Sequence, residues 1–268
     1  MTPTGVERRF VRLAHGAVHC AVAGSGRPIL LLHQTPRSWD EYRDVLPILA
    51  RAGYRAIAMD TPGFGDSCGL DSSDDSIEAW AEVAVGLLDA LDLDRAAIVG
   101  HHTGAVIALE ICAAYADRVD AAVLSSAPFV DAAYRAAHSG RAVVDEVERG
   151  ADGSHLVELW RLRRPFYPAD SGELLERFLV DALKAGDRAA EGHRVVARYE
   201  MERRLPLVRC PVLLVDAVDD PHASPFVERL HAELPASTVA RIPGGMVPLP
   251  DQLPEEFATA IVSFLERG

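Results

Sequence analysis

The sequence has no hydrophobic run approaching the roughly 20 residues that a membrane-spanning helix needs. Residues 1–12 carry three arginines but are not followed by an apolar core of the signal-peptide type. We therefore expect a cytoplasmic protein without a membrane anchor. Basic residues are also scarce, since 27 of them face 40 acidic residues and the net charge is −13. This balance argues against nucleic acid or an anionic membrane as a partner.

Cysteine is rare as well. None of the four cysteines forms a C-x-x-C pair, and Cys20, Cys112 and Cys210 lie in or beside apolar segments, so we expect buried free thiols. Cys68 follows a turn and is expected to be more exposed. The histidines show neither H-x-x-H nor H-E-x-x-H spacing, so we expect no metal site. We expect no cofactor either.

What the chain does have is 49% hydrophobic residues, enough for a sizeable core, and an alternation of short apolar runs with helical patterns. This alternation predicts a largely parallel sheet covered by helices. The predicted strands are 18–23, 28–33, 54–59, 96–99, 119–124, 211–215 and 237–242. The predicted helices are 39–52, 76–92, 105–115 and 254–267.

The pattern changes over residues 129–204, where charged helical segments dominate and no strong strand signal is present. This composition is typical of a helical cap inserted into a sheet domain. The expected organisation is therefore a core formed by residues 1–128 and 205–268, with a cap formed by residues 129–204.

The most informative residue is His102. It lies at the centre of Gly100-His101-His102-Thr103-Gly104, directly after a predicted strand. The pattern is that of a G-x-S-x-G elbow, a sharp strand-to-helix turn, with imidazole where serine belongs. Imidazole is a poor acyl carrier but a good proton acceptor near neutral pH. The residue types therefore favour proton transfer over serine chemistry at this position.

Several segments in this order resemble the alpha/beta-hydrolase superfamily over nearly the whole chain. They are residues 29–33, 60–67, the elbow, 210–215 and 254–257. The resemblance implies an alpha/beta-hydrolase fold, with a mostly parallel sheet of about eight strands flanked by helices and an inserted helical cap.

This chain departs from the family's serine, acid and histidine triad. The resemblance assigns the acid to Asp220, whereas the loop 243–248, where the family has its histidine, contains none. Met246 or Gly245 is expected in the histidine's place. The loop after the first parallel strand also differs, since His-Gly becomes His33-Gln34.

The two triad changes fit together. Without the usual histidine there is room for the ring of His102 to reach Asp220, directly or through one water. Our hypothesis is a relocated His102–Asp220 dyad in which the carboxylate fixes the tautomer of the ring and favours its protonated form. A binding or relic role for His102 is the alternative.

Other residues are expected to complete the site. Backbone N–H groups of Thr103 and of Thr35 or Gln34 are candidates to stabilise an oxyanion, and the side chain of Thr103 should point away from the substrate. The Gln34 amide would either bind substrate or pack within its loop. The candidates for substrate binding are His33, Ser126, Trp160, His222 and Met246.

These expectations define an enzyme acting on a small or medium carbonyl compound, with His102 as general base. Hydrolysis of an ester or lactone is one reaction, and proton abstraction of the lyase, decarboxylase or cyclase type is the other. A catalytically silent binding or receptor protein on the same scaffold is the alternative. The partner is a small molecule in every case. The oligomeric state stays open, a homo-oligomer included.

Overall fold

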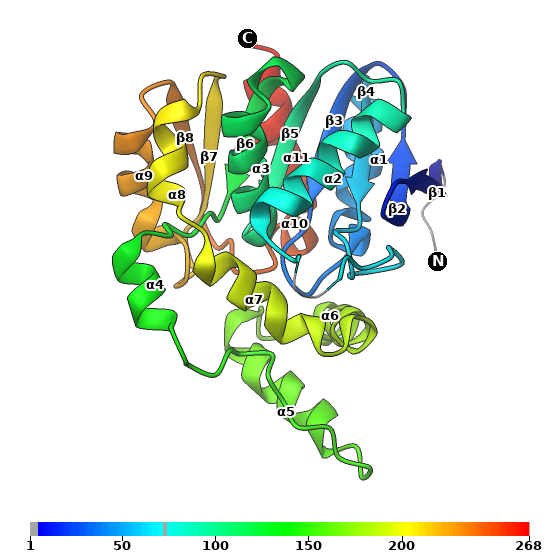
Figure 1. The fold of residues 1–268 in the computed structure, drawn as a ribbon, viewed down its shortest axis with the longest axis vertical. Coiled ribbons are helices and arrows are strands. Elements are labelled where there is room, and N and C mark those ends of the chain that lie inside the picture. The colour runs from blue at the N-terminus through cyan, green and yellow to red at the C-terminus, as the bar shows by residue number, and fades with distance from the viewer. Residues whose placement is uncertain (1–4, 72–73, 268) are drawn as a thin grey trace.

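The computed structural model describes residues 5–71 and 74–267. They form an eight-stranded sheet in the order β1-β2-β4-β3-β5-β6-β7-β8 (Figure 1). Strand β2 runs antiparallel to both its neighbours, and β3 to β8 are parallel to one another. The strands are β1 (Val6–Leu13), β2 (Gly16–Ala23), β3 (Arg27–Leu32), β4 (Tyr54–Met59), β5 (Ala96–His101), β6 (Val119–Ser125), β7 (Val212–Ala217) and β8 (Ser237–Ile242).

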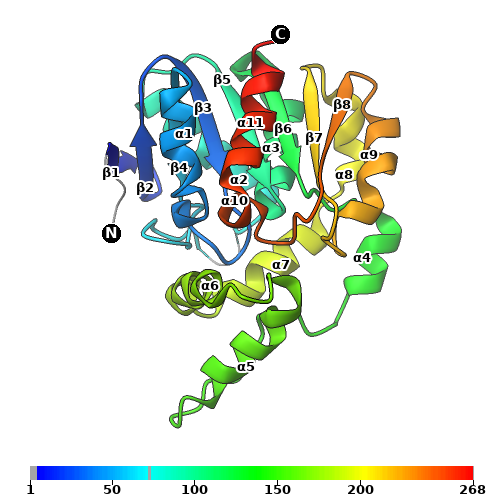
Figure 2. The same ribbon diagram turned by 180° about the vertical axis from the view of Figure 1, so that it is seen from behind.

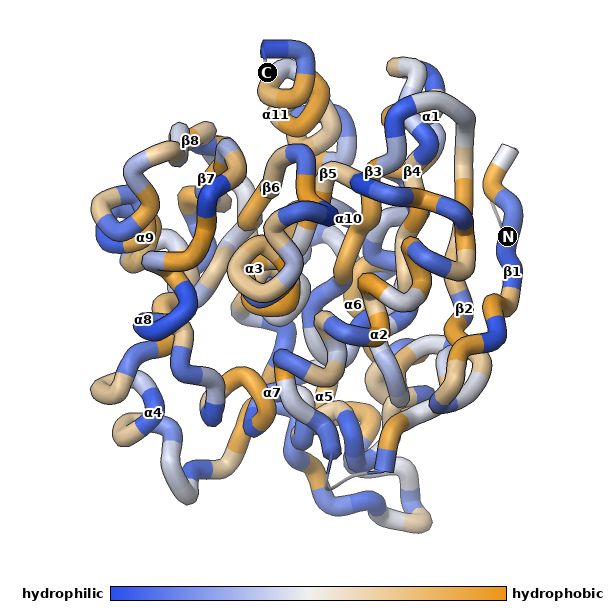
Figure 3. Tube along the Cα trace, turned by 45° about the horizontal axis from the view of Figure 1, so that its top comes forward, coloured by the Kyte–Doolittle hydropathy of each residue, from blue (hydrophilic) through white to orange (hydrophobic). Residues whose placement is uncertain are grey.

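Helices cover both faces of the sheet. Figure 2 shows α1 (Val45–Arg51) and α11 (Pro254–Leu265) on one face, and Figure 1 shows α2 (Ile77–Ala90) and α3 (Thr103–Ala114) on the other. Each face has its own buried apolar cluster. The middle strands are apolar along most of their length (Figure 3), as expected when both faces of a parallel sheet are buried. The alpha/beta-hydrolase architecture expected from the sequence is therefore present.

Two predictions about local structure were incomplete. The segment 39–52 is not one helix, because a 3-10 turn, Trp39–Tyr42, ends before α1 begins at Val45. Pro47 explains the break, since its ring would clash with the carbonyl of Arg43 in a continuous helix. Strand β1 was not predicted at all. It has four charged residues among eight and pairs only with β2 at the edge of the sheet, so its apolar signal is weak.

The helices between β6 and β7, called the cap below, lie at the end of the sheet where the parallel strands terminate (Figures 1 and 2). The cap has a small apolar cluster of its own. The domain boundaries on either side of residues 129–204 stay a prediction. The helices are α4 (Ala132–His138), α5 (Ser154–Arg163), α6 (Gly172–Ala185), α7 (Arg188–Arg198) and α8 (Met201–Arg204).

The cap rests directly on the loop that follows β3. A Cβ atom added at Gly192 in α7 would lie 2.5 Å from Oγ1 and 2.6 Å from Cγ2 of Thr35. It would also lie 2.9 Å from the ring of Phe64. These distances are shorter than van der Waals contact, so the helix backbone itself touches the loop.

Candidate active site

The elbow holds His102 in a backbone conformation that residues with a side chain rarely adopt. Its φ is 47° and its ψ is −111°, between the end of β5 and the start of α3. The flanking glycines allow this turn, because a Cβ atom at Gly104 would lie 1.8 Å from the carbonyl oxygen of Leu32 and one at Gly100 would lie 2.0 Å from that of Gly104. Such strain is retained where the surrounding structure determines it, typically at functional sites. The His102 side chain is 15% exposed.

His102 and Asp220 are in contact. The Nε2 atom of His102 lies 2.7 Å from Oδ2 of Asp220, which is in the loop after β7 and is fully buried. The two atoms form an ion-pair contact without the alignment of a hydrogen bond. A carboxylate only accepts, so this contact places a proton on Nε2. The other ring nitrogen, Nδ1, has no hydrogen-bond partner among the described residues.

Asp220 is held in its ionised form. Burial by itself raises the pKa of this carboxyl, but the interaction with the His102 ring more than compensates and keeps the pKa well below its usual range. The backbone N–H of His222 contributes, donating to Oδ1 at 2.9 Å. The site therefore contains a fixed negative charge directly behind the His102 ring, as the sequence-based hypothesis requires.

The expected oxyanion donors do not all face the cavity. The N–H of Thr103, in the first turn of α3, has no partner among the residues that the structure describes. The N–H of Thr35 donates to Thr103 Oγ1 at 3.3 Å. The Thr103 hydroxyl therefore faces the loop after β3, and both residues line the cavity. Among the described residues the N–H of Thr103 is without a partner, whereas the N–H of Thr35 is already used.

Gln34 packs in its loop. Its backbone N–H donates to Glu41 Oε2 at 2.9 Å, and its side-chain amide donates to Glu41 Oε1 at 2.7 Å and to the carbonyl of Val247 at 3.5 Å. Full burial raises the pKa of Glu41 to about 8. Because these donors are already used, Gln34 is not available as an oxyanion donor, although it lines the cavity.

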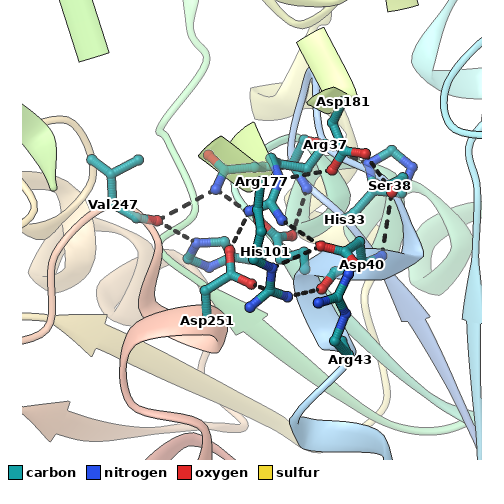
Figure 4. Close-up of polar contacts among 12 residues, drawn as sticks. His33, Arg37, Ser38, Asp40, Arg43, His101, Arg177, Asp181, Val247 and Asp251 are labelled. Atoms are coloured by element: carbon teal, nitrogen blue, oxygen red, sulfur yellow. Dashed lines mark hydrogen bonds and ion pairs between the residues drawn. The ribbon is translucent and has the colours of Figure 1, made fainter. Parts of the chain in front are cut away.

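His101 braces the elbow from behind, as Figure 4 shows for its contact with Val247. Its Nε2 donates to the carbonyl of Val247 at 2.8 Å, and its Nδ1 accepts from the hydroxyl of Ser125 at 2.9 Å. Burial lowers the pKa of His101 to about 3, so the ring stays neutral. Val247, and not Met246 or Gly245, is the residue of this loop that lines the cavity beside His102.

Besides Met246, three further predicted substrate contacts lie outside the cavity described here. His33 is buried, its Nδ1 donates to the carbonyl of Gln34 at 2.8 Å and its Nε2 accepts from the N–H of Thr61 at 2.9 Å. Ser126 is buried at a φ of 47°, and its hydroxyl has no partner among the described residues. Trp160 packs in the apolar cluster of the cap. Each role was assigned from position along the chain, which does not fix where a side chain points.

The cavity in front of His102 has a volume of about 240 Å³ and lies between the core and the cap. It accommodates a small molecule. His222, predicted as a substrate contact, does line it. The cap contributes most of the remaining wall. The lining residues are Gln34, Thr35, His102, Thr103, Pro128, Tyr134, His138, Ala142, Val143, Val144, Arg163, His193, Arg194, Val196, Ala197, His222 and Val247.

A buried charged cluster joins the cap to the core beside this cavity (Figure 4). Arg37, which is fully buried, pairs with Asp181 of α6 at 2.8 Å and with Asp251 of the core. Arg177 of α6 also pairs with Asp251, at 2.8 Å, and with Asp40, at 2.8 Å. We call these five residues the Arg37 cluster. It fixes α6 to the core by side chains that are largely out of contact with water.

Potential metal ligands gather elsewhere. Within residues 5–71 and 74–267, the group with ligand atoms close enough for one ion is His19, Asp60 and Asp66. His19 Nδ1 is 2.8 Å from Asp60, and Asp66 pairs with Arg8 and Lys184, so protein contacts already use these atoms. Cys20 and Cys112 are buried and Cys68 is exposed, as predicted, whereas Cys210 is only half-buried. No helix in the described part of the chain is long and apolar enough to cross a membrane.

Comparison with known proteins agrees with this architecture. A family model described as alpha/beta hydrolase fold matches residues 27–145. The solved structure of a thermophilic esterase from Thermogutta terrifontis superimposes with a TM-score of 0.80 at 23% identity, covering 97% of this chain and 98% of that one. At this identity the likeness shows the fold alone. The chain is thus a protein of the alpha/beta-hydrolase fold.

Two curated relatives carry the names of hydrolytic enzymes. Epoxide hydrolase 2 of Siraitia grosvenorii is 43% identical over 115 residues, which cover 42% of this chain and 36% of that protein. The chain thus spans about a third of that relative's length. Haloalkane dehalogenase 2 of Mycobacterium bovis is 27% identical over 277 residues, covering 96% of this chain and 94% of that protein.

Proposed function

We propose that this protein is a cofactor-independent enzyme that uses water to cleave a small or medium ester or lactone, with His102 as general base. The observation that carries the proposal is the 2.7 Å contact of His102 Nε2 with a buried, ionised Asp220, which leaves Nδ1 unpartnered among the described residues on a ring that lines the cavity. The hydrolytic names of the relatives support the choice of water as the second reactant.

In the proposed reaction, Nδ1 of His102 takes a proton from a water molecule while the water oxygen attacks the substrate carbonyl carbon. The ring becomes an imidazolium, and Asp220 stabilises its charge. The negative charge that develops on the carbonyl oxygen is met by the N–H of Thr103. Collapse of the tetrahedral intermediate breaks the bond from carbon to the leaving oxygen, which leaves as the alcohol once it has gained a proton, and yields the acid.

This assignment differs from a serine mechanism in a way that can be measured. A general base adds no covalent intermediate, whereas a nucleophilic histidine would carry the acyl group. Wild type should hydrolyse members of a panel of esters and lactones, and His102→Gln should lower kcat by about 10²–10⁴-fold. Rapid-quench mass spectrometry should find no acyl adduct. His231→Gln, which changes a histidine of α9 (Val227–Glu233) outside the cavity, is the matched control.

Three outcomes would contradict the proposal. An acyl group trapped on His102 would make it a nucleophile. Turnover of β-keto acids with no ester or lactone cleavage would assign proton abstraction from carbon. Binding of ligand without turnover of any substrate, retained in His102→Gln, would identify a binding protein on this scaffold.

A further inference from the structure

A second histidine–aspartate pair lies on the cap side of the same cavity. His193 of α7 places Nε2 at 2.7 Å from Oδ2 of Asp145, which belongs to the irregular segment between α4 and α5. The Asp145 side chain is fully buried, and the His193 side chain is 27% exposed. The geometry therefore repeats that of His102 and Asp220: a buried carboxylate behind an imidazole that lines the cavity.

Arg163 fixes the charge of this second carboxylate. Its Nε donates to Asp145 Oδ1 at 2.7 Å and its Nη2 donates to Oδ2, so the guanidinium grips both oxygens. Burial by itself raises the pKa of Asp145, but Arg163 and His193 lower it to about 2. The Arg163 guanidinium also stacks over the ring of Phe178, 4.8 Å from its centroid. Asp145 is therefore ionised and held in one place.

The contacts of His193 leave one nitrogen for chemistry. Nε2 lies 2.7 Å from Oδ2 of Asp145 and 3.2 Å from Nη2 of Arg163. The shorter contact, with an ionised carboxylate that only accepts, favours a proton on Nε2, and Nδ1 has no hydrogen-bond partner among the described residues. Of the four described histidines that line the cavity, His102 and His193 place a ring nitrogen against an aspartate. His138 instead donates from Nδ1 to the carbonyl of Tyr134, and the ring of His222 packs against Phe166.

We propose that His193 is the catalytic acid of the reaction and gives a proton to the oxygen that leaves the substrate. The inference rests on the proposed function and names its substrate class, an aliphatic ester or a lactone. In the forward step, protonated His193 donates its Nδ1 proton as the bond from carbon to the leaving oxygen breaks, and both bonding electrons stay on that oxygen. His193 ends neutral and His102 ends protonated, and proton exchange with solvent restores both.

Two separate dyads suit an unactivated leaving group. In this reaction His102 holds the proton that it took from water. With His193 as a second proton donor on the cap side of the cavity, His102 does not have to reorient toward the leaving oxygen. An aliphatic alkoxide is strongly basic and cannot leave without a proton, whereas 4-nitrophenolate is weakly basic and leaves unaided. The need for an acid therefore depends on the substrate, and general acid catalysis contributes about 10²–10⁴-fold where it is needed.

The test compares two esters of the same acid, an ethyl ester and a 4-nitrophenyl ester, together with a γ-lactone. His193→Gln should lower kcat for the ethyl ester and the lactone by about 10²-fold or more and lower kcat for the nitrophenyl ester by less than about 3-fold. Asp145→Asn should show the same dependence on the leaving group. His155→Gln, a histidine of cap helix α5 outside the cavity, should match wild type on all three.

The outcomes separate this inference from the proposed function. If His193→Gln slows all three substrates equally, or none, His193 is not the acid, and the role of His102 is unaffected. If His102→Gln retains wild-type rates, the proposed function fails whatever His193 does. Absence of turnover by wild type overturns both. Thermal unfolding checks folding, and because Asp145→Asn leaves Arg163 buried without its partner, His193→Gln decides the result if Asp145→Asn is unfolded.

Discussion

Nε2 of His102 lies 2.7 Å from Oδ2 of Asp220, and the two residues are 118 positions apart in the chain. The carboxylate balances the charge that the ring gains when it accepts a proton. Asp220→Asn removes this charge and should lower kcat by about 10²–10⁴-fold with little change in KM. Steady-state kinetics on the best substrate checks it. The exposed neighbour Asp219 provides the control, as Asp219→Asn should retain wild-type kcat.

The position of Val247 leads to a second prediction. Its backbone carbonyl binds His101 and Gln34, while the residue lines the cavity beside His102, so its side chain can be changed without losing those contacts. His102→Ser combined with Val247→His should rebuild a serine, histidine and aspartate site. The double variant should be labelled by a fluorophosphonate, whereas wild type and His102→Ser alone should not. Labelling of wild type would contradict the assignment of the elbow.

His101 should make the protein sensitive to mild acid. The pKa of this buried ring is about 3 in the folded state, against 6.5 for an ordinary histidine. The unfolded chain therefore binds the proton first, and stability is lost as the pH falls below 6.5. The loss should reach about 2 kcal/mol between pH 6.5 and pH 5. Urea unfolding at both pH values checks it, and His101→Gln should flatten the slope.

Glu41 should make the stability of the folded protein depend on pH in the neutral to alkaline range. Its pKa is raised to about 8 by burial, against an ordinary value of 4.5, so the folded state holds a proton that the unfolded state has released. Stability is therefore complete below pH 4.5 and falls as the pH rises through 8. Histidines are still partly protonated at pH 7 in the unfolded chain, and burial raises the pKa of Cys20 to about 11, so both also change the stability between pH 7 and pH 9. The contribution of Glu41 is therefore the difference between two variants: wild type should lose more stability over this range than Glu41→Gln.

The Arg37 cluster should control how tightly the cap is held. Asp181 accepts from Arg37 Nε and from the Ser38 hydroxyl, both at 2.8 Å, so Asp181→Asn removes one charge partner of the buried guanidinium while Asp251 stays in place (Figure 4). The free energy of unfolding should fall, by less than the about 3 kcal/mol expected when a buried charge loses its sole partner. Amide hydrogen exchange should accelerate in α6 first. Asp170→Asn, at an exposed aspartate of the cap, should change neither the free energy of unfolding nor the rate of amide exchange in α6. Unchanged exchange in α6 would show that apolar packing alone holds the cap.

The parallel sheet could be predicted from the sequence because a strand buried on both faces has a continuous apolar signal. Residues 54–59 and 237–242 were predicted with their observed bounds. The edge strand β1 could not be found this way, since Glu7, Arg8, Arg9 and Arg12 mask its pattern. Pro47 is the local sequence feature that argues against a single helix over 39–52, because proline in a helix interior breaks the helix before it.

The contact between His102 and Asp220 could be predicted because the family resemblance assigned both positions, and both residues follow strands of one parallel sheet, whose carboxyl ends meet at the same edge. The role of Gln34 could not be predicted in the same way. Its donors are used by Glu41, and the sequence does not show that the fold of the loop brings Glu41 to Gln34. No feature of the sequence indicated a functional role for Asp145. It lies in a segment without regular structure, and its partner His193 is 48 residues away.

The contact of α7 with Thr35 at Gly192 bears on how molecules enter and leave. The backbone of α7 packs there directly against the side chain of Thr35, so an outward movement of α7 would disturb the loop that carries Thr35 and would move His193 away with it. We therefore expect substrate and product to enter and leave through the wall formed by residues 138–144. This segment is largely exposed, and four of its residues line the cavity. In this arrangement α7 would hold His193 in position while the segment 138–144 opens the cavity to solvent.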